Sequence, residues 1–159
     1  MNIHDALDYF NGKNTIDPGF LYALEEGEPR KDLVNHFRQQ PERTFALTLL
    51  NNLVTHRREN SAHGLHETLL FACYLLGLAR QVEDCLIIWN AKTTDFDTFC
   101  GIDVQLVVFA GVDETITYLK MQNSDEAREA LTYIQECNEA GDFEDLTSYF
   151  DPNTLPWFV

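Results

Sequence analysis

The stretch SDEAREALTYIQECNEAG, residues 124–141, predicts a complete α-helix with both of its ends. Ser124 is a preferred N-cap residue, and the acidic side chains of Asp125 and Glu126 suit the positive end of a helix dipole. Apolar residues then recur at helical spacing, and Gly141 is the residue type that most often ends a helix. The same combination of cap, apolar spacing and terminating residue recurs along the chain.

Helix signals of this kind lie on both sides of that stretch. Further helices are expected from Pro18 to a stop at Gly27, from Pro29 past Phe37, from Pro41 to Arg58, and over residues 65–79, 82–92, 112–121 and 142–150. Short turns at 111, 122–124 and 141 imply that neighbouring helices are antiparallel. We therefore predict an all-α fold of stacked antiparallel helix pairs, either a short α-solenoid or an irregular helical bundle.

Residues 102–110, IDVQLVVFA, fit two kinds of structure. Their β-branched residues favour a strand. Ile102, Leu106 and Phe109 are spaced as on one helix face, and the chain offers no second strand for pairing. A helix is therefore the better prediction here, and residues 93–101, TTDFDTFCG, are expected to form the loop before it.

The length of 159 residues predicts one helical domain over 1–159. The tail, residues 151–159, ends in LPWFV, and we expect it to dock on the helices through Trp157 because chain ends are usually polar. A docking peptide for a partner is the alternative. The expected core includes Leu49, Leu69, Leu76, Leu86, Trp89, Leu106, Leu131 and Ile134.

Several features predict a cytoplasmic protein. The longest apolar run, residues 69–79, is shorter than the ~20 residues that span a bilayer. The opening MNIHDALDYF has acidic residues where a secretory signal has basic ones. The four cysteines form no CxxC pair, so we expect them to be reduced and buried.

No sequence motif identifies a reaction. His63, His66 and Glu67 do not have the order of a zinc protease motif, and the residues after Asp95 and Asp97 do not fit a calcium loop. Nucleophile and phosphate-binding motifs are absent from the sequence. We therefore expect no metal site, no cofactor and no enzymatic activity.

The negative charge is concentrated in the second half of the chain. The net charge is −15, and residues 1–80 contain ten acidic and eight basic residues, whereas residues 81–159 contain sixteen and three. A negative field of this size repels nucleic acid and anionic lipid and attracts cationic partners. Direct binding to nucleic acid or to a membrane is therefore not expected.

Alternating helices would gather many of these acids at one end of the second half. The candidate partner-binding residues are Glu83, Asp84, Asp113, Glu114, Glu139, Asp142, Glu144 and Asp145. The opposite end would hold Asp95, Asp97, Asp103, Asp125, Glu126 and Glu129 together with Lys92, Lys120 and Arg128. The alternative is that most of the eight only complement helix dipoles, because acids favour first helical turns.

A small, acidic, helical chain without a catalytic signature resembles the immunity proteins of bacterial toxin systems. That resemblance, one of size, charge and fold class, implies a compact cytoplasmic inhibitor that blocks a cationic toxin domain, often a nuclease, with an acidic surface. The expected function is therefore toxin neutralisation by protein–protein binding. The alternative is a helical-repeat adaptor or regulatory module that binds through a helical face or groove.

Overall fold

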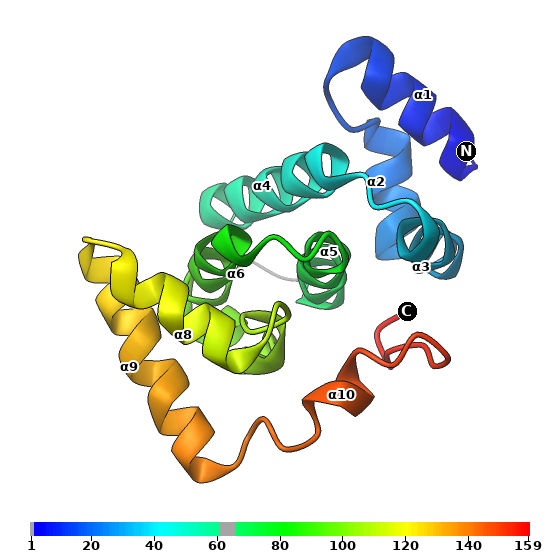
Figure 1. Ribbon diagram of the computed structural model, residues 1–159. Coiled ribbons are helices and arrows are strands. Elements are labelled where there is room, and N and C mark those ends of the chain that lie inside the picture. The colour runs from blue at the N-terminus through cyan, green and yellow to red at the C-terminus, as the bar shows by residue number, and fades with distance from the viewer. Residues whose placement is uncertain (1, 61–65) are drawn as a thin grey trace. The chain divides into compact units, whose positions relative to one another are not determined.

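The computed structural model describes residues 2–60 and 66–159 (Figure 1). It is 71% helical, with no strand among the described residues, which confirms the all-α prediction. The chain forms two compact units: unit 1 comprises residues 1–79 and 155–159, and unit 2 comprises residues 80–154. The single domain predicted from the sequence thus contains two units, and unit 2 is inserted ahead of the last five residues of unit 1.

The described residues of unit 1 form five helices, of which the first is not among those predicted from the sequence. They are α1 (Ile3–Lys13), α2 (Pro18–Glu25), α3 (Arg30–Gln39), α4 (Arg43–Glu59) and α5 (His66–Leu78). Asp17 caps α2, since its carboxylate accepts a hydrogen bond of 3.0 Å from the Phe20 amide and Pro18 is the first helical residue. The predicted starts at Pro29 and Pro41 are each within two residues of the observed ones, as expected where caps define the ends.

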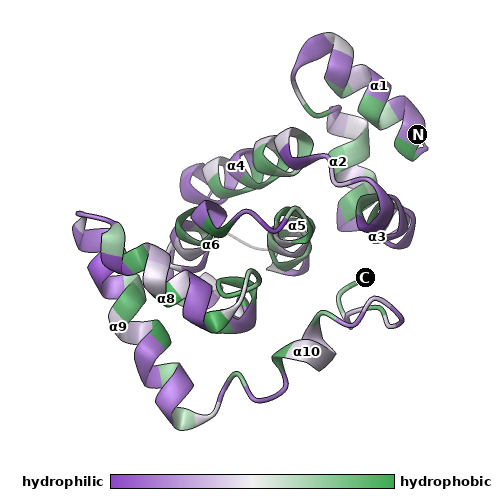
Figure 2. Cartoon of the chain, in the orientation of Figure 1, coloured by the Kyte–Doolittle hydropathy of each residue, from purple (hydrophilic) through white to green (hydrophobic). Residues whose placement is uncertain are grey.

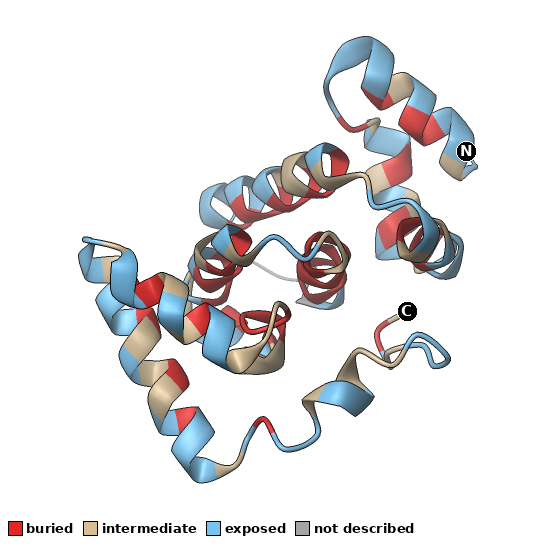
Figure 3. Cartoon of the chain, in the orientation of Figure 1, coloured by how far each residue is buried: buried red, intermediate tan, exposed pale blue. Residues whose placement is uncertain are grey.

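The α5 helix is the centre of unit 1. Every side chain over residues 69–76 is at most 1% exposed, and the helix is apolar from Leu69 to its end (Figures 2 and 3). A helix that is apolar on all sides must be covered on all sides, and α2, α3 and α4 all contact it. Beside it, the ring of Phe45 packs edge-on against those of Phe10, Phe20 and Phe37.

The last five residues pack on unit 1 through Phe158 instead of Trp157. Phe158 is 2% exposed and its ring lies 5.7 Å from that of Tyr74, whereas Trp157 is 71% exposed. The prediction that Trp157 packs on the helices is therefore wrong. Neighbouring side chains in a non-helical segment point in different directions, so burial of Phe158 leaves Trp157 in solvent.

Unit 2 contains the short 3₁₀ helices η1 (Val82–Asp84) and η2 (Val104–Leu106) and five α-helices. These are α6 (Cys85–Lys92), α7 (Phe96–Gly101), α8 (Val112–Met121), α9 (Asp125–Ala140) and α10 (Leu146–Tyr149). The α8 and α9 helices pack against each other, and α6 and η1 contact this pair. Ser124 caps α9, and Gly141 ends it at a φ of 86°, both as predicted.

Three segments of unit 2 differ from the sequence prediction. Residues 96–101 form α7, because Asp95 and Thr98 exchange backbone and side-chain hydrogen bonds in a capping box. Residues 102–110 form neither an α-helix nor a strand: η2 is followed by turns, and the Ile102 carbonyl accepts a hydrogen bond from Lys92. The expected helix over 142–150 is only α10, preceded by turns.

Six of the eight predicted core residues are buried. Leu86 and Leu131 are only half-buried, which corrects the prediction for these two positions. On α9, the buried face consists of Ala127, Ala130, Ile134 and Cys137. Leu131 lies at the edge of that face, where helical spacing alone does not separate half-burial from burial.

Candidate partner-binding surface

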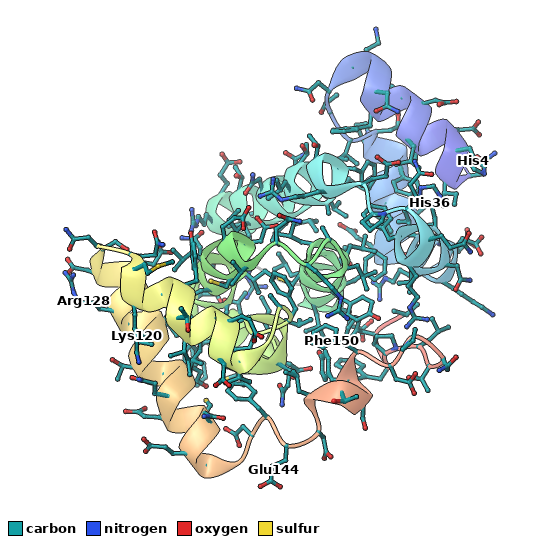
Figure 4. The ribbon with its side chains drawn as sticks, in the orientation of Figure 1. His4, His36, Lys120, Arg128, Glu144 and Phe150 are labelled. Atoms are coloured by element: carbon teal, nitrogen blue, oxygen red, sulfur yellow. The ribbon has the colours of Figure 1, made fainter. Side chains whose placement is uncertain are left out.

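The α8 and α9 helices form an antiparallel pair joined by the turn at residues 122–124. Figure 4 shows Lys120 and Arg128 at the end of the pair where this turn lies. Asp113 and Glu114 are exposed in the first turn of α8, at the opposite end. The chain thus separates the two exposed bases from these acids along the helix pair, as the sequence analysis predicts.

The remaining acids of the predicted set follow the second helix of the pair. Glu139 is exposed in the last turn of α9, and Asp142, Glu144 and Asp145 are exposed in the turns after it. Figure 4 shows Glu144 on the segment between α9 and α10. Because α9 is six residues longer than α8, its last turns extend about 9 Å further along the axis. These acids therefore spread over a longer surface than a single helix end.

The two acids of η1 differ from the other six. Asp84 is 0% exposed, so it does not belong to the exposed set. Glu83 is exposed, and its charge adds to the effect of burial in raising the pKa of Tyr118. The η1 helix contacts α8, so Glu83 lies close to this helix.

An acidic face along α9 was missed in the sequence analysis. Asp125, Glu129, Glu136 and Glu139 are all exposed at spacings of four, seven and three residues. These spacings place them on one side of a helix, opposite its buried face. A groove of about 370 Å³ runs along the same side and is lined by Arg128, Glu129, Thr132, Tyr133 and Glu136. The sequence analysis groups Asp125, Glu129 and Glu139 by helix end and does not consider Glu136, although the spacing of the four acids is readable from the sequence.

The surface of unit 2 carries few positive charges. Of its sixteen acidic side chains eleven are exposed, against three exposed bases, Arg80, Lys120 and Arg128. Arg128 is paired with Asp125 one helical turn away. The fourth base, Lys92, is 3% exposed and does not contribute to the surface. We call the exposed acids of α8, α9 and residues 142–145 the acidic surface of unit 2.

Lys92 is held by carbonyl groups and aromatic rings inside unit 2. Its ammonium donates hydrogen bonds to the carbonyl oxygens of Phe99 and of Ile102, the latter at 2.7 Å. It also lies 4.6 Å from the ring centre of Phe99 and 5.8 Å from that of Tyr133. These contacts replace the water that a buried ammonium loses. The sequence analysis placed Lys92 among the surface bases, which is wrong.

Two of the three thiols of unit 2, those of Cys85 and Cys137, are buried and have raised pKa values. Burial raises the pKa of the Cys85 thiol to about 12. Burial and a hydrogen bond with Asp142 raise the pKa of Cys137. A reactive cysteine requires the opposite shift, because the thiolate is the nucleophile. A pocket of about 460 Å³, lined mainly by residues 109–111 and 146–152, contains neither thiol in its wall.

The other candidate ligands have structural roles or lie outside the described residues. Asp95 is the N-cap of α7, and Asp103 accepts a hydrogen bond of 2.8 Å from the Tyr149 hydroxyl. His63 and the side chain of His66 are outside the described residues. Among those that are described, no group of three or more His, Cys, Asp or Glu side chains is placed to hold a metal ion.

Comparison of the chain with protein-family models, with curated proteins and with solved structures found no match. A search of the described residues for a helix that is long and apolar enough to cross a bilayer also found none.

Proposed function

We propose that this protein is a non-enzymatic inhibitor of the immunity type, which acts in the bacterial cytoplasm and neutralises a cationic toxin or nuclease domain by binding to it. The observation that carries the proposal is the charge of the unit 2 surface, with eleven exposed acids and three exposed bases. Such a surface raises the local concentration of a cationic partner and speeds its encounter.

The division of the charge between the units supports a dedicated acidic surface. Unit 1 has ten acidic and seven basic side chains, a net charge of −3, whereas unit 2 has sixteen and four, a net charge of −12. The cost of this asymmetry is repulsion between like charges within unit 2. A bound cationic partner would relieve that repulsion. Partner binding would therefore explain why the negative charge is concentrated in unit 2.

Helix-dipole compensation accounts for only part of this surface. Asp113 and Glu114 are in a first helical turn, where an acid is favourable. Glu139 is in the last turn of α9, where the dipole opposes it, and Glu129 and Glu136 are in the middle of the helix. The three acids of α9 therefore need another explanation, and partner binding supplies one.

A second candidate is an adaptor or regulatory module, which the exposed aromatic residue of the tail favours. Trp157 is 71% exposed, although the residue after it is buried and holds the tail in place. Tryptophan is enriched among the residues that dominate protein–protein binding. An adaptor that binds through this residue would depend on Trp157 and be insensitive to the acids of unit 2.

Co-expression tests the proposal directly. The gene directly upstream in the source genome is expressed alone and together with this protein, and growth is measured. We expect the neighbouring product to be toxic and the protein to restore growth. A variant with Asp113, Glu114, Asp142 and Asp145 changed to Asn or Gln should restore growth poorly. Full rescue by this variant with loss of rescue in Trp157→Ala would mean that inhibition acts through the tail and not through the acidic surface of unit 2. Failure of the wild-type protein to restore growth against a toxic neighbouring product would reject inhibition and favour the adaptor.

A further inference from the structure

Residues 155–159 are attached to the helices of unit 1 at one residue. Phe158 is 2% exposed, whereas Leu155 is 39% exposed and Trp157 is 71% exposed. Among the described residues, the only hydrogen bond between residues 155–159 and the rest of unit 1 runs from the Arg30 guanidinium to the Phe158 carbonyl oxygen. Few buried contacts are typical of segments that open locally while their surroundings stay folded. Residues 155–159 thus resemble a bound peptide that is joined to its own receptor.

The helices of unit 1 hold this segment by one ring and one carbonyl group. The Phe158 ring packs edge-on against the ring of Tyr74 in α5, at a centroid distance of 5.7 Å and an angle of 70°. The Phe158 carbonyl oxygen lies 2.9 Å from Nη1 of Arg30, the first residue of α3. Tyr74 is 0% exposed and Arg30 is 4% exposed, so both contacts are made out of water. We call the site that Tyr74 and Arg30 form the Phe158 socket.

The Phe158 socket keeps its hydrogen-bond donor in place when Phe158 leaves. Arg30 also donates to the carbonyl oxygen of Leu24 at 2.8 Å. Further acceptors are the Thr68 hydroxyl at 3.1 Å and the Glu67 carboxylate at 3.2 Å. These bonds hold the guanidinium and its charge without any contribution from Phe158. The open socket therefore presents a pre-organised donor beside an aromatic ring, which lowers the cost of binding a ligand.

We infer that the Phe158 socket is a docking site for an aromatic residue in a segment of a protein partner, and that residues 155–159 occupy it in the partner's absence. The partner's ring would pack on Tyr74 as Phe158 does, and the carbonyl oxygen of the same residue would accept the hydrogen bond from Arg30. A tethered competitor has an effective concentration on the order of millimolar. A partner segment therefore displaces residues 155–159 only when the partner also binds at a second place.

This docking site does not depend on the acidic surface of unit 2. Arg30, Tyr74 and Phe158 all belong to unit 1. The groups that the socket would recognise, a ring and a backbone carbonyl, are uncharged, so salt and the acids of unit 2 should affect binding there very little. The socket and the acidic surface therefore stand or fall separately.

The test uses the full-length variant Phe158→Ala and the synthetic peptide acetyl-TLPWFV-amide, which has the sequence of residues 154–159. Binding is measured by calorimetry and by the NMR signals of the Tyr74 ring. We expect saturable binding and a higher melting temperature of the variant with the peptide. The same peptide with alanine in place of phenylalanine should bind at least about tenfold more weakly, because it lacks the ring. The wild-type protein, whose own Phe158 competes, should also bind the peptide at least about tenfold more weakly than the variant.

Two further variants separate the socket from other peptide-binding surfaces. Trp157→Ala removes the neighbouring ring and leaves the socket occupied, so its affinity for the peptide should stay within about twofold of that of the wild-type protein. Phe158→Leu keeps a smaller apolar side chain, serves if Phe158→Ala does not fold, and should bind the peptide more tightly than the wild-type protein. The inference is overturned if neither Phe158 variant binds the peptide saturably, if the alanine peptide binds equally well, or if Trp157→Ala and the wild-type protein bind as tightly as the Phe158 variants.

Discussion

The guanidinium of Arg30 donates a hydrogen bond of 2.9 Å to the carbonyl oxygen of Phe158, 128 residues further along the chain. The same side chain donates to the carbonyl oxygen of Leu24 at 2.8 Å and to the Thr68 hydroxyl at 3.1 Å. Arg30 is 4% exposed, so these bonds lie out of water. One buried arginine thus joins the end of α2, the start of α5 and the C-terminal residues of unit 1.

Replacing Arg30 by Met should destabilise the protein by about 2–4 kcal/mol. The change would leave the carbonyl oxygens of Leu24 and Phe158 buried without this donor, and a buried unsatisfied acceptor costs roughly 1–3 kcal/mol. Urea unfolding followed by circular dichroism would measure the difference. Lys31→Met is the matched control at the exposed neighbouring position, with an expected change within about 0.5 kcal/mol. Equal stability of the two variants would show that the arginine bonds contribute little.

The tail should be anchored by Phe158 and not by Trp157. Phe158→Ala removes a buried ring and should cost roughly 3 kcal/mol, whereas Trp157→Ala at an exposed position should cost less than about 0.5 kcal/mol. Deletion of residues 155–159 should likewise lower the melting temperature. In Trp89→Phe, emission from the remaining Trp157 should be typical of a solvated indole. A blue-shifted emission there, or a large cost of Trp157→Ala, would contradict the exposed position.

Local sequence signals predict most of the helices of this protein, because caps and apolar spacing act within a few residues. Ser124 and Gly141 define α9 in this way. The sequence predicts a loop where α7 forms, because Thr98 takes the place of the Glu or Gln that usually marks a capping box.

The residues whose structure or burial differs from the sequence prediction depend on contacts with residues outside their own segment, which local sequence patterns do not encode. At the start of residues 102–110, the Ile102 carbonyl accepts a hydrogen bond from the side chain of Lys92, a contact that helical spacing does not predict. Burial of Phe158 instead of Trp157 depends on Tyr74 and Arg30, far away in the sequence. The burial of Asp84 and Lys92 likewise follows from tertiary packing, so a charge count assigned both to the surface.

The stability of unit 2 should fall as the pH rises above about 9. The Cys85 thiol has an ordinary pKa of 9.0 in the unfolded chain and a pKa raised to about 12 in the folded protein. Between these values the unfolded state releases a proton that the folded state keeps, so unfolding becomes more favourable. The slope should be at most about 1.4 kcal/mol per pH unit from this group. Stability is unaffected by this group below pH 9.

Urea unfolding at a series of pH values between 8 and about 10.5 would measure this slope. Cys85→Ala should reduce it, although part should remain because the pKa of Cys137 is raised as well. Cys100→Ala, at the exposed cysteine, is the control and should leave the slope unchanged. A slope that is identical in Cys85→Ala and the parent protein would contradict a strongly raised pKa for this thiol.

Finally, if a cationic partner binds as proposed, its association should depend on the acidic face of α9 as well as on the acids near the ends of α8 and α9. Glu129, Glu136 and Glu139 are exposed on one side of the helix, away from its buried residues, so changing all three to Gln leaves the packing intact. Loss of three charges weakens the field that attracts the partner, and the association rate at low salt should fall by roughly tenfold. Stopped-flow measurements at several salt concentrations would show this, with a shallower salt dependence for the variant, because the screening length is only ~8 Å at physiological ionic strength.

Changing Asp5, Asp8 and Glu28 of unit 1 to Asn or Gln alters the net charge equally and should change the rate much less. Glu139→Gln alone should also slightly raise stability, since it removes an acid from the C-terminal end of a helix. If the two triple variants associate equally fast, net charge and not the α9 face guides the partner.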